Sequence, residues 1–312
     1  MPFELDKKVV IAIASSALFD LREPHGVFLK EGVEAYRKFQ REHEDEPLPT
    51  GIAFPFIRRL LSLNDRGTGD APVEVVFISA NDPDTGSRAF NSAAHYGLDI
   101  TRGAFVSGAE PWPYIRAFNA CLFLSANQRN VKEAIMHGSP AGCVLESVVL
   151  DPAEDHELRV AFDFDGVLAD DQSENVFKDG GLEAFQRFEE RMVKVAHNPG
   201  PLKRLIEELG KLQQREIDRQ LADRSYTPRV KVAIVTARNA PAHKRFVTTL
   251  REWGIRVDQT FFLGGIEKTR VLELFKPHIF FDDQMTHLGP AAKFVPSVHV
   301  PYGKLNSSEP GD

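Results

Sequence analysis

The chain has 312 residues, of which 42% are hydrophobic and 27% are charged, the composition of an ordinary globular protein rather than of a disordered or membrane one. Its formal net charge of −7 argues against a nucleic-acid polymer as the main partner, because no basic excess is available to neutralise a phosphate backbone. The two cysteines, Cys121 and Cys143, are too few for a disulfide framework or a cysteine-based zinc site, which fits a reducing compartment.

Short runs rich in β-branched residues recur ahead of helical stretches along the chain. This alternation predicts an α/β fold with a parallel sheet and flanking helices. The helical pattern is clearest over Leu202–Gln214, where apolar residues recur at helical spacing, and a long helix is also expected over Phe28–Glu46. The predicted strands are Val9–Ala14, Val73–Ile78, Val160–Phe164, Lys231–Val235 and Ile279–Phe281.

The second half of the chain is similar to the first. A gapless shift aligns Val73–Asn81 with Val230–Arg238, and each segment is a predicted strand that ends at a hydroxyl residue. The same shift pairs Arg88 with Arg245. The match predicts two similar α/β halves, although a generic strand and helix alternation would produce part of it.

We expect the two halves to be separate domains, 1–150 and 151–312, joined at the acidic stretch Leu150–Glu157. Charged residues distinguish the halves. The first half has Ile13, Ser15, Pro111, Ser125 and Ala126 where the second has Asp163, Asp165, Lys268, Asp282 and Asp283. The first domain is therefore expected to be a degenerate copy without catalytic residues, and the second to be the catalytic half.

Two carboxylates follow the predicted strand that begins at Val160. The segment Val160-Ala-Phe-Asp-Phe-Asp-Gly-Val-Leu168 is an apolar run that leads into Asp163 and Asp165, and then into a glycine that permits a tight turn. In an open α/β sheet the carboxyl ends of the strands form the edge where ligands bind. Hard oxygen ligands of this kind suit Mg²⁺, whereas a lone Asp-x-Asp can also simply cap a loop.

Three further groups follow the same logic. Asp282 and Asp283 end the apolar run that begins at Ile279, Thr236 follows the strand over Lys231–Val235, and Lys268 comes after a pair of glycines. Taken singly, such an acid pair is often a turn or helix cap, such a threonine an N-cap and such a lysine a solvated cation. Their order along the chain favours a shared site.

That ordered set resembles the four motifs of phosphatases in the haloacid-dehalogenase (HAD) superfamily. The resemblance implies that Asp163 is the nucleophile and that Asp165 is the general acid and base. It implies that Thr236 hydrogen-bonds a phosphate oxygen and that Lys268 offsets negative charge. It also implies a Mg²⁺ ion bound by Asp163, by the carbonyl of Asp165 and by the Asp282–Asp283 pair, with Asp282 favoured as the direct ligand.

The chain further resembles the cytosolic 5′-nucleotidase type I family over nearly its full length. The segments that carry this resemblance are Ala17-Leu-Phe-Asp-Leu21, Gly32-Val-Glu-Ala-Tyr36, Ala161-Phe-Asp163, Val235-Thr-Ala-Arg238, Phe280-Phe-Asp-Asp-Gln284 and Val300-Pro-Tyr-Gly303. Within Phe162–Leu168 the chain is more similar to HAD phosphatases in general, which leaves its substrate range open. The implied reaction is Mg²⁺-dependent hydrolysis of nucleoside 5′-monophosphates through an aspartyl-phosphate.

Substrate contacts are expected around the catalytic motifs and in a helical cap. HAD enzymes commonly carry a cap after the first motif, here residues 171–199, where Phe177 could stack on a base. The candidate substrate-binding residues are Thr236, Ala237, Arg238, Lys268, Phe177, Arg88 and Asn91. The aromatic pair Trp112 and Tyr114 could bind a nucleotide effector, although core packing would also explain it.

The expected partners are a nucleoside monophosphate, an effector nucleotide and a second copy of the chain, with no nucleic-acid polymer. No apolar run reaches the roughly 18 residues of a membrane span and no secretory leader is recognisable, so the expected location is the cytoplasm without membrane attachment. Two alternatives stay open. One is a HAD phosphatase or phosphotransferase acting on another small phosphomonoester such as a sugar phosphate, and the other is a non-catalytic nucleotide-binding protein.

Overall fold

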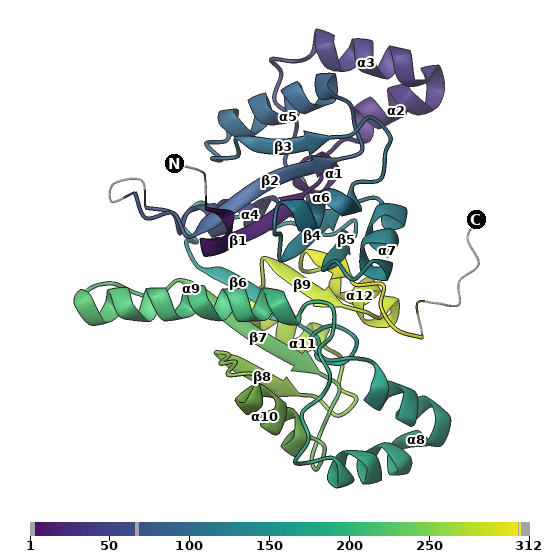
Figure 1. Cartoon of the computed structure of the whole chain (residues 1–312), viewed down its shortest axis with the longest axis vertical. Coiled ribbons are helices and arrows are strands. Elements are labelled where there is room, and N and C mark those ends of the chain that lie inside the picture. The colour runs from purple at the N-terminus through teal and green to yellow at the C-terminus, as the bar shows by residue number, and fades with distance from the viewer. Residues whose placement is uncertain (1–3, 66–68, 305, 307–312) are drawn as a thin grey trace. The chain divides into compact units, whose positions relative to one another are not determined.

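The computed structural model describes residues 4–65, 69–304 and 306, and it divides the chain into two compact units, Met1–Val144 and Leu145–Asp312. Each unit is a twisted parallel sheet with helices packed against it (Figure 1). The division lies before the expected boundary at residue 150, so the last residues of the first predicted domain belong to the second unit. Among the described residues, no helix combines the length and apolar character needed to cross a membrane.

In the first unit the strand order is β3-β2-β1-β4-β5, with neighbouring strands parallel. The strands are β1 (Val9–Ile13), β2 (Val73–Ser79), β3 (Arg102–Phe105), β4 (Leu122–Ser125) and β5 (Ala141–Val144). The helices are η1 (Leu5–Lys7), α1 (Ser15–Leu18), α2 (Arg22–Glu31), α3 (Val33–Glu42), α4 (Phe54–Leu61), α5 (Pro83–His95), α6 (Trp112–Ala117) and α7 (Gln128–Met136). Strands β1, β2 and β4 are buried along their whole length, as expected for strands covered on both faces.

In the second unit the order is β10-β9-β6-β7-β8, again with parallel pairings. The strands are β6 (Leu158–Phe162), β7 (Val230–Thr236), β8 (Gln259–Phe262), β9 (Ile279–Asp282) and β10 (Ser297–His299). The helices are α8 (Gln172–Arg191), α9 (Lys203–Ala222), α10 (His243–Glu252), α11 (Thr269–Phe275) and α12 (Met285–Ala291). Side chains of β6, β7 and β9 pack against α11 and α12 in one apolar cluster that includes Ala161, Val235, Phe280, Leu272 and Leu288.

The mixed α/β architecture with flanking helices is therefore confirmed. In chain order, the first strand of each unit lies at the centre of its sheet, with the second and third strands on one side and the fourth and fifth on the other. The two units thus share one strand order. A duplication would produce this similarity, and a common origin of the two halves stays a prediction.

The expected helix over Phe28–Glu46 is wrong in one respect, because the structure has two helices, α2 and α3, that meet at Gly32. Gly32 has φ +85°, a conformation that side-chain-bearing residues rarely adopt. The same break occurs in the second unit, where Gly181 with φ +69° interrupts α8. Each unit thus carries a pair of helical arms joined at a glycine, and in the second unit the pair lies within the predicted cap.

Candidate active site

The site lies at the carboxyl edge of the sheet in the second unit. Asp163 follows β6 directly, Thr236 is the last residue of β7, and Asp282 is the last residue of β9. Because β6 lies between β7 and β9 and all three are parallel, their carboxyl ends come together. Asp163 is fixed at this edge by its backbone N–H, which donates to the carbonyl of Phe281 over 2.8 Å.

Lys268 binds two of these carboxylates. Its Nζ lies 2.8 Å from Oδ2 of Asp163 and 2.7 Å from Oδ2 of Asp282, and all three side chains are almost fully buried. Burial raises the pKa of Asp163 to about 7 against the opposing charge of Lys268. Burial alone would lower the pKa of Lys268, but the two carboxylates raise it, so this lysine stays charged. Oδ1 of Asp163 accepts the N–H of Phe164 over 2.7 Å.

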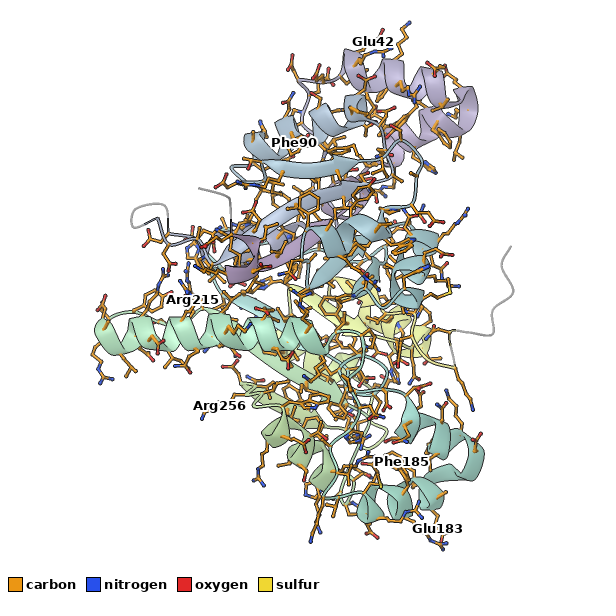
Figure 2. All side chains as sticks on the ribbon, viewed as in Figure 1. Glu42, Phe90, Glu183, Phe185, Arg215 and Arg256 are labelled. Atoms are coloured by element: carbon orange, nitrogen blue, oxygen red, sulfur yellow. The ribbon has the colours of Figure 1, made fainter. Side chains whose placement is uncertain are left out.

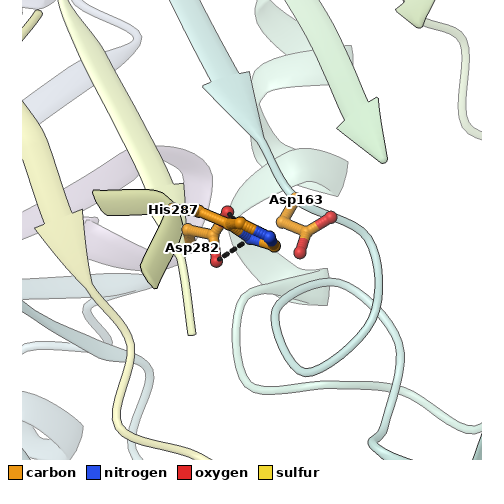
Figure 3. A group of neighbouring side chains, drawn as sticks. All are labelled: Asp163, Asp282 and His287. Atoms are coloured by element: carbon orange, nitrogen blue, oxygen red, sulfur yellow. Dashed lines mark hydrogen bonds and ion pairs between the residues drawn. The ribbon is translucent and has the colours of Figure 1, made fainter. Parts of the chain in front are cut away.

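Asp282 has further partners. Its Oδ2 lies 3.3 Å from Nδ1 of His287, and its Oδ1 accepts the N–H of Gln284 over 2.9 Å. Figure 3 shows His287 directed at Asp282, with Asp163 opposite at the end of β6. Among the described residues, Asp163, Asp282 and His287 offer ligand atoms that all lie within 4.8 Å of one another, a spacing at which they could share a cation.

Asp283, unlike Asp282, has no hydrogen-bond donor at its carboxylate among the described residues. Both of its carboxylate oxygens are buried and accept no hydrogen bond from any residue that the structure describes. Burial and the charges of Asp282, Asp163 and Glu174 raise the pKa of Asp283 to about 10. A carboxylate that is buried without a partner is costly, and a divalent cation would remove that cost. The donor set around Asp283 therefore fits a hard metal ion.

Asp165 is held by Arg238. Nε of Arg238 donates to Oδ2 of Asp165 over 2.7 Å, and Nη2 donates to Oδ1 over 2.6 Å. The Asp165 side chain keeps 17% of its surface exposed, whereas Arg238 is buried. The candidate proton-transfer group is thus partly accessible to solvent, whereas its cationic partner is not.

Arg238 in turn reaches the helical arms. Its Nη1 donates to Oε2 of Glu189, near the end of α8, and Nη2 lies 2.9 Å from Nε2 of His197. Arg245 of α10 donates to Oε1 of Glu189 over 3.0 Å. Burial alone would raise the pKa of Glu189, but the positive charge of Arg238 and the hydrogen bond from Ser173 lower it below its ordinary value.

The remaining candidates of the second unit are Thr236 and Ala237 at the end of β7 and Phe177 on α8. Thr236 is buried, and its hydroxyl oxygen accepts the N–H of Arg238 over 3.2 Å, while Ala237 between them is exposed. Phe177 is 48% exposed on α8 and makes an edge contact with Phe185. Figure 2 shows Phe185 on the inner side of α8.

Arg88 and Asn91 make their contacts within the first unit. Arg88 is buried and donates to Oε1 of Gln40 over 2.9 Å and to the carbonyl of Glu46 over 3.0 Å. Asn91 donates to the carbonyl of Glu44 over 3.2 Å. These bonds fasten α5 to α3 and the segment after it, and a role in substrate binding stays a prediction for both residues.

Sequence reasoning missed the residues that support the motifs. Glu189, His197 and His287 stand alone in the sequence, and nothing about their spacing links them to Asp165 or Asp282. Arg245 gives a usable signal, since it matches Arg88 of the first half. A buried acid on an otherwise amphipathic helix, such as Glu189, could also have indicated a buried cation nearby.

Comparisons with known proteins agree with the geometry. A family model described as 5′-nucleotidase matches residues 1–307. The chain is 34% identical over 306 residues to human cytosolic 5′-nucleotidase 1B, covering 96% of this chain and 50% of that protein. The chain therefore spans about half the length of this curated relative. No solved structure gave a significant match.

Proposed function

Because the chain belongs to the 5′-nucleotidase family, we propose that it hydrolyses nucleoside 5′-monophosphates to nucleoside and phosphate with the help of Mg²⁺. One observation carries the proposal. Asp163, Lys268 and Asp282 form a buried set of ion pairs beside Asp283, a buried carboxylate that lacks a partner among the described residues. Both the charge and the ligand types suit a metal ion together with a phosphate group.

Asp163 is the nucleophile of the proposed reaction. Its Oδ1 is held by the N–H of Phe164 and its Oδ2 by Lys268, which fixes the carboxylate for attack on phosphorus. The phosphorus–oxygen bond to the ribose breaks as the aspartyl-phosphate forms. Lys268 keeps its positive charge in this environment and offsets the negative charge that Asp163 and the phosphate bring together.

Asp165 transfers the protons. It donates a proton to the leaving ribose oxygen, and it then takes a proton from the water that attacks the aspartyl-phosphate. Its partly exposed carboxylate is compatible with both steps, because a leaving group and a water molecule must each reach it. Thr236 supplies a hydroxyl at the end of β7 for a phosphate oxygen.

The metal would be held by Asp163, Asp283 and the backbone carbonyl of Asp165. The sequence favours Asp282 as the direct ligand, but its oxygens are already bound by Lys268, His287 and the N–H of Gln284. The unpartnered oxygens of Asp283 fit that role better. When bound, Mg²⁺ supplies positive charge that neutralises the phosphate oxygens and aligns them for displacement.

Substrate selection is assigned to the cap, residues 171–199, and to the residues after β7. The exposed ring of Phe177 could stack on a nucleobase, and Ala237 offers backbone to the phosphate. The human relative is named as a cytosolic enzyme, which supports a cytoplasmic location. A nucleotide effector near Trp112 and Tyr114 and a homo-oligomer stay predictions.

The test is phosphate release from AMP, IMP, CMP, UMP and glucose 6-phosphate, with Mg²⁺ and with EDTA, for the wild type and Asp163→Asn. Asp155→Asn is a matched control, because Asp155 precedes β6 and Asp163 follows it. The proposal expects Mg²⁺-dependent release from nucleotides that falls by at least about a thousandfold in Asp163→Asn and is retained in Asp155→Asn.

Other outcomes would change the assignment. Release from glucose 6-phosphate alone would replace the nucleotide by a sugar phosphate. Phosphate transfer to an added nucleoside, in place of release, would make the protein a phosphotransferase. Tight nucleotide binding without turnover of any substrate would support a non-catalytic nucleotide-binding protein.

A further inference from the structure

We propose that Arg238 is a positioning residue for Asp165 and that Glu189 secures Arg238 to α8. The packing of α8 against the sheet and the orientation of the proton-transfer group are then coupled. The inference rests on the proposed hydrolase activity and extends it to residues outside the four motifs. Its basis is a chain of direct contacts that runs from Asp165 through Arg238 to Glu189.

The guanidinium of Arg238 is held on every side. Two of its nitrogens bind the two oxygens of Asp165, and the third binds Glu189. Its carbon lies 5.3 Å from the ring centre of Phe164 and 5.4 Å from that of Phe185, distances at which cation–π attraction operates. The planar group has little freedom to turn, so the carboxylate that it binds is oriented as well.

Glu189 connects this group to both arms of α8. Its Oε1 accepts a hydrogen bond of 2.7 Å from Ser173, which lies in the first turn of the same helix before the break at Gly181. Arg245 of α10 binds the same oxygen. Two carboxylates and two guanidiniums therefore balance in charge, and the set contains little exposed surface apart from Asp165.

His197 completes the set as a neutral acceptor. Burial is the main cause that lowers the pKa of His197. Arginine can only donate, so Nε2 of His197, 2.9 Å from Nη2 of Arg238, must accept. The ring proton is then on Nδ1, which lies 2.7 Å from Oγ1 of Thr249. A neutral histidine fixes Arg238 without disturbing the charge balance.

The first unit shows which part of this set is tied to chemistry. Arg88 binds Gln40 over 2.9 Å, as Arg245 binds Glu189 over 3.0 Å. Gln40 follows Gly32 at the same spacing as Glu189 follows Gly181. The contact that fastens the helical arms is thus present in both units.

The contact that reaches the proton-transfer position differs between the units. Where the second unit has Arg238 and Asp165, the first has Asn81 and Ser15, joined by a neutral hydrogen bond of 3.2 Å. The bidentate ion pair occurs in the unit that carries the nucleophile and is replaced in the unit that lacks it. We therefore assign the contact between Arg245 and Glu189 to the anchoring of the cap. We assign the contact between Arg238 and Asp165 to the positioning of the proton-transfer group.

The first experiment compares Arg238→Lys with Arg159→Lys. Lysine keeps the charge but cannot bind both carboxylate oxygens at once. Arg159 is a matched control, because it likewise binds both oxygens of Asp155, at the start of β6 and away from the site. With AMP and Mg²⁺, Arg238→Lys should lower kcat by about ten- to hundredfold with less than about threefold change in KM, and Arg159→Lys should leave both unchanged.

A double-mutant cycle tests whether Arg238 acts through Asp165. In an Asp165→Asn background the proton-transfer group is already lost, so adding Arg238→Lys should lower kcat by less than about twofold. Glu189→Asp, which keeps the charge but shortens the reach, should give a smaller loss than Arg238→Lys in the wild-type background and none in Asp165→Asn.

A second readout does not need turnover. Coupling between α8 and Asp165 is reciprocal, so Asp165→Asn should speed amide hydrogen exchange in α8, whereas Asp155→Asn should not. If the wild type released phosphate from no substrate, the proposed function would fail, and this exchange measurement would still decide the positioning role.

Four results would overturn the inference. A rise in KM with kcat unchanged in Arg238→Lys would make Arg238 a direct phosphate ligand, and faster turnover in that variant would make the ion pair a restraint on Asp165. The other two are fully additive losses of kcat in the double-mutant cycle and unchanged amide hydrogen exchange in α8 when Asp165 is substituted.

Discussion

Gly166 leaves the space that Asp283 occupies, because a Cβ at Gly166 would lie 2.5 Å from Oδ2 of Asp283. Gly166 also has φ +74°, which any other side chain would strain. The glycine of the Asp-x-Asp-Gly sequence thus serves a residue far along the chain. The backbone of the turn after β6 therefore packs directly against the carboxylate of Asp283, which follows β9.

Gly166→Ala should therefore impair metal activation. The added methyl group must displace Asp283, so we expect a higher Mg²⁺ concentration for half-maximal rate together with lower maximal activity. Gly210→Ala is the control, since Gly210 lies within α9 and a methyl group there would meet no atom within 4 Å, so that alanine should stabilise the helix by about 0.5–1 kcal/mol. An unchanged dependence of the rate on Mg²⁺ concentration in Gly166→Ala would show that Asp283 does not bind the metal.

Asp283→Asn should raise the melting temperature of the metal-free protein and abolish its further rise with Mg²⁺. The raised pKa of Asp283 favours the protonated form, so its contribution to metal-free stability is complete below the ordinary pKa and is lost as pH rises towards about 10. Mg²⁺ should consequently stabilise the wild type more at pH 8 than at pH 6. Scanning fluorimetry at both pH values measures this, and equal Mg²⁺ shifts in Asp283→Asn and wild type would refute it.

Lys268→Met should lower kcat by about 10²–10³-fold, because the transferring phosphate loses a fixed cation. The variant also leaves Asp163 and Asp282 facing each other in a buried site, so its free energy of unfolding should fall in the absence of Mg²⁺. Lys211→Met, at an exposed ion pair with Glu208, is the control and should change neither quantity. Steady-state rates and denaturant unfolding give the comparison.

Glu189 should make stability depend on acid pH. Its folded-state pKa lies below the ordinary value of about 4.5, so its ion pairs stabilise the fold above that pH and are lost as the pH falls through the lowered pKa. The difference in unfolding free energy between wild type and Glu189→Gln should be on the order of 3 kcal/mol near pH 6 and should shrink towards pH 2. A difference that is constant with pH would show that Glu189 is not ionised in the fold.

The sequence predicts the strands β1, β2, β6, β7 and β9, but it misses the short buried strands β4, β5 and β10, which have only three or four residues each. Runs such as Val73–Ile78 are largely apolar, which is the pattern of strands buried on both faces, and the corresponding strand β2 is confirmed. Three of the four motifs can be placed for the same reason, since Asp163, Thr236 and Asp282 each lie at the carboxyl end of a strand. Lys268 follows a pair of glycines in a loop, and its place in the site is predicted only from the order of the motifs. The short strands β3 and β8 are partly exposed and lack such a run, so the sequence predicts no strand there.

The contacts behind the motifs could not be predicted. The structure pairs Arg238 with Asp165 and Glu189, the second of which lies on α8, and neither contact follows from its motif, while a contact with substrate stays a prediction. Pairing of this kind depends on where a helix is seated against the sheet, and hydrophobic periodicity fixes only which face is buried. Similarly, Gly32 gives only a weak signal that the expected helix breaks there, because a glycine inside a helix costs about 1 kcal/mol relative to alanine and is often tolerated.

The break at Gly181 makes the cap tip replaceable. Residues 177–183 are exposed, while Glu174 on one arm binds Gln284 and Glu189 on the other binds the two arginines. Both attachments lie outside the tip, so a loop of different length or chemistry could be grafted between them without altering either. Substrate choice could then be redesigned, or diversify among relatives, while the catalytic groups keep their positions.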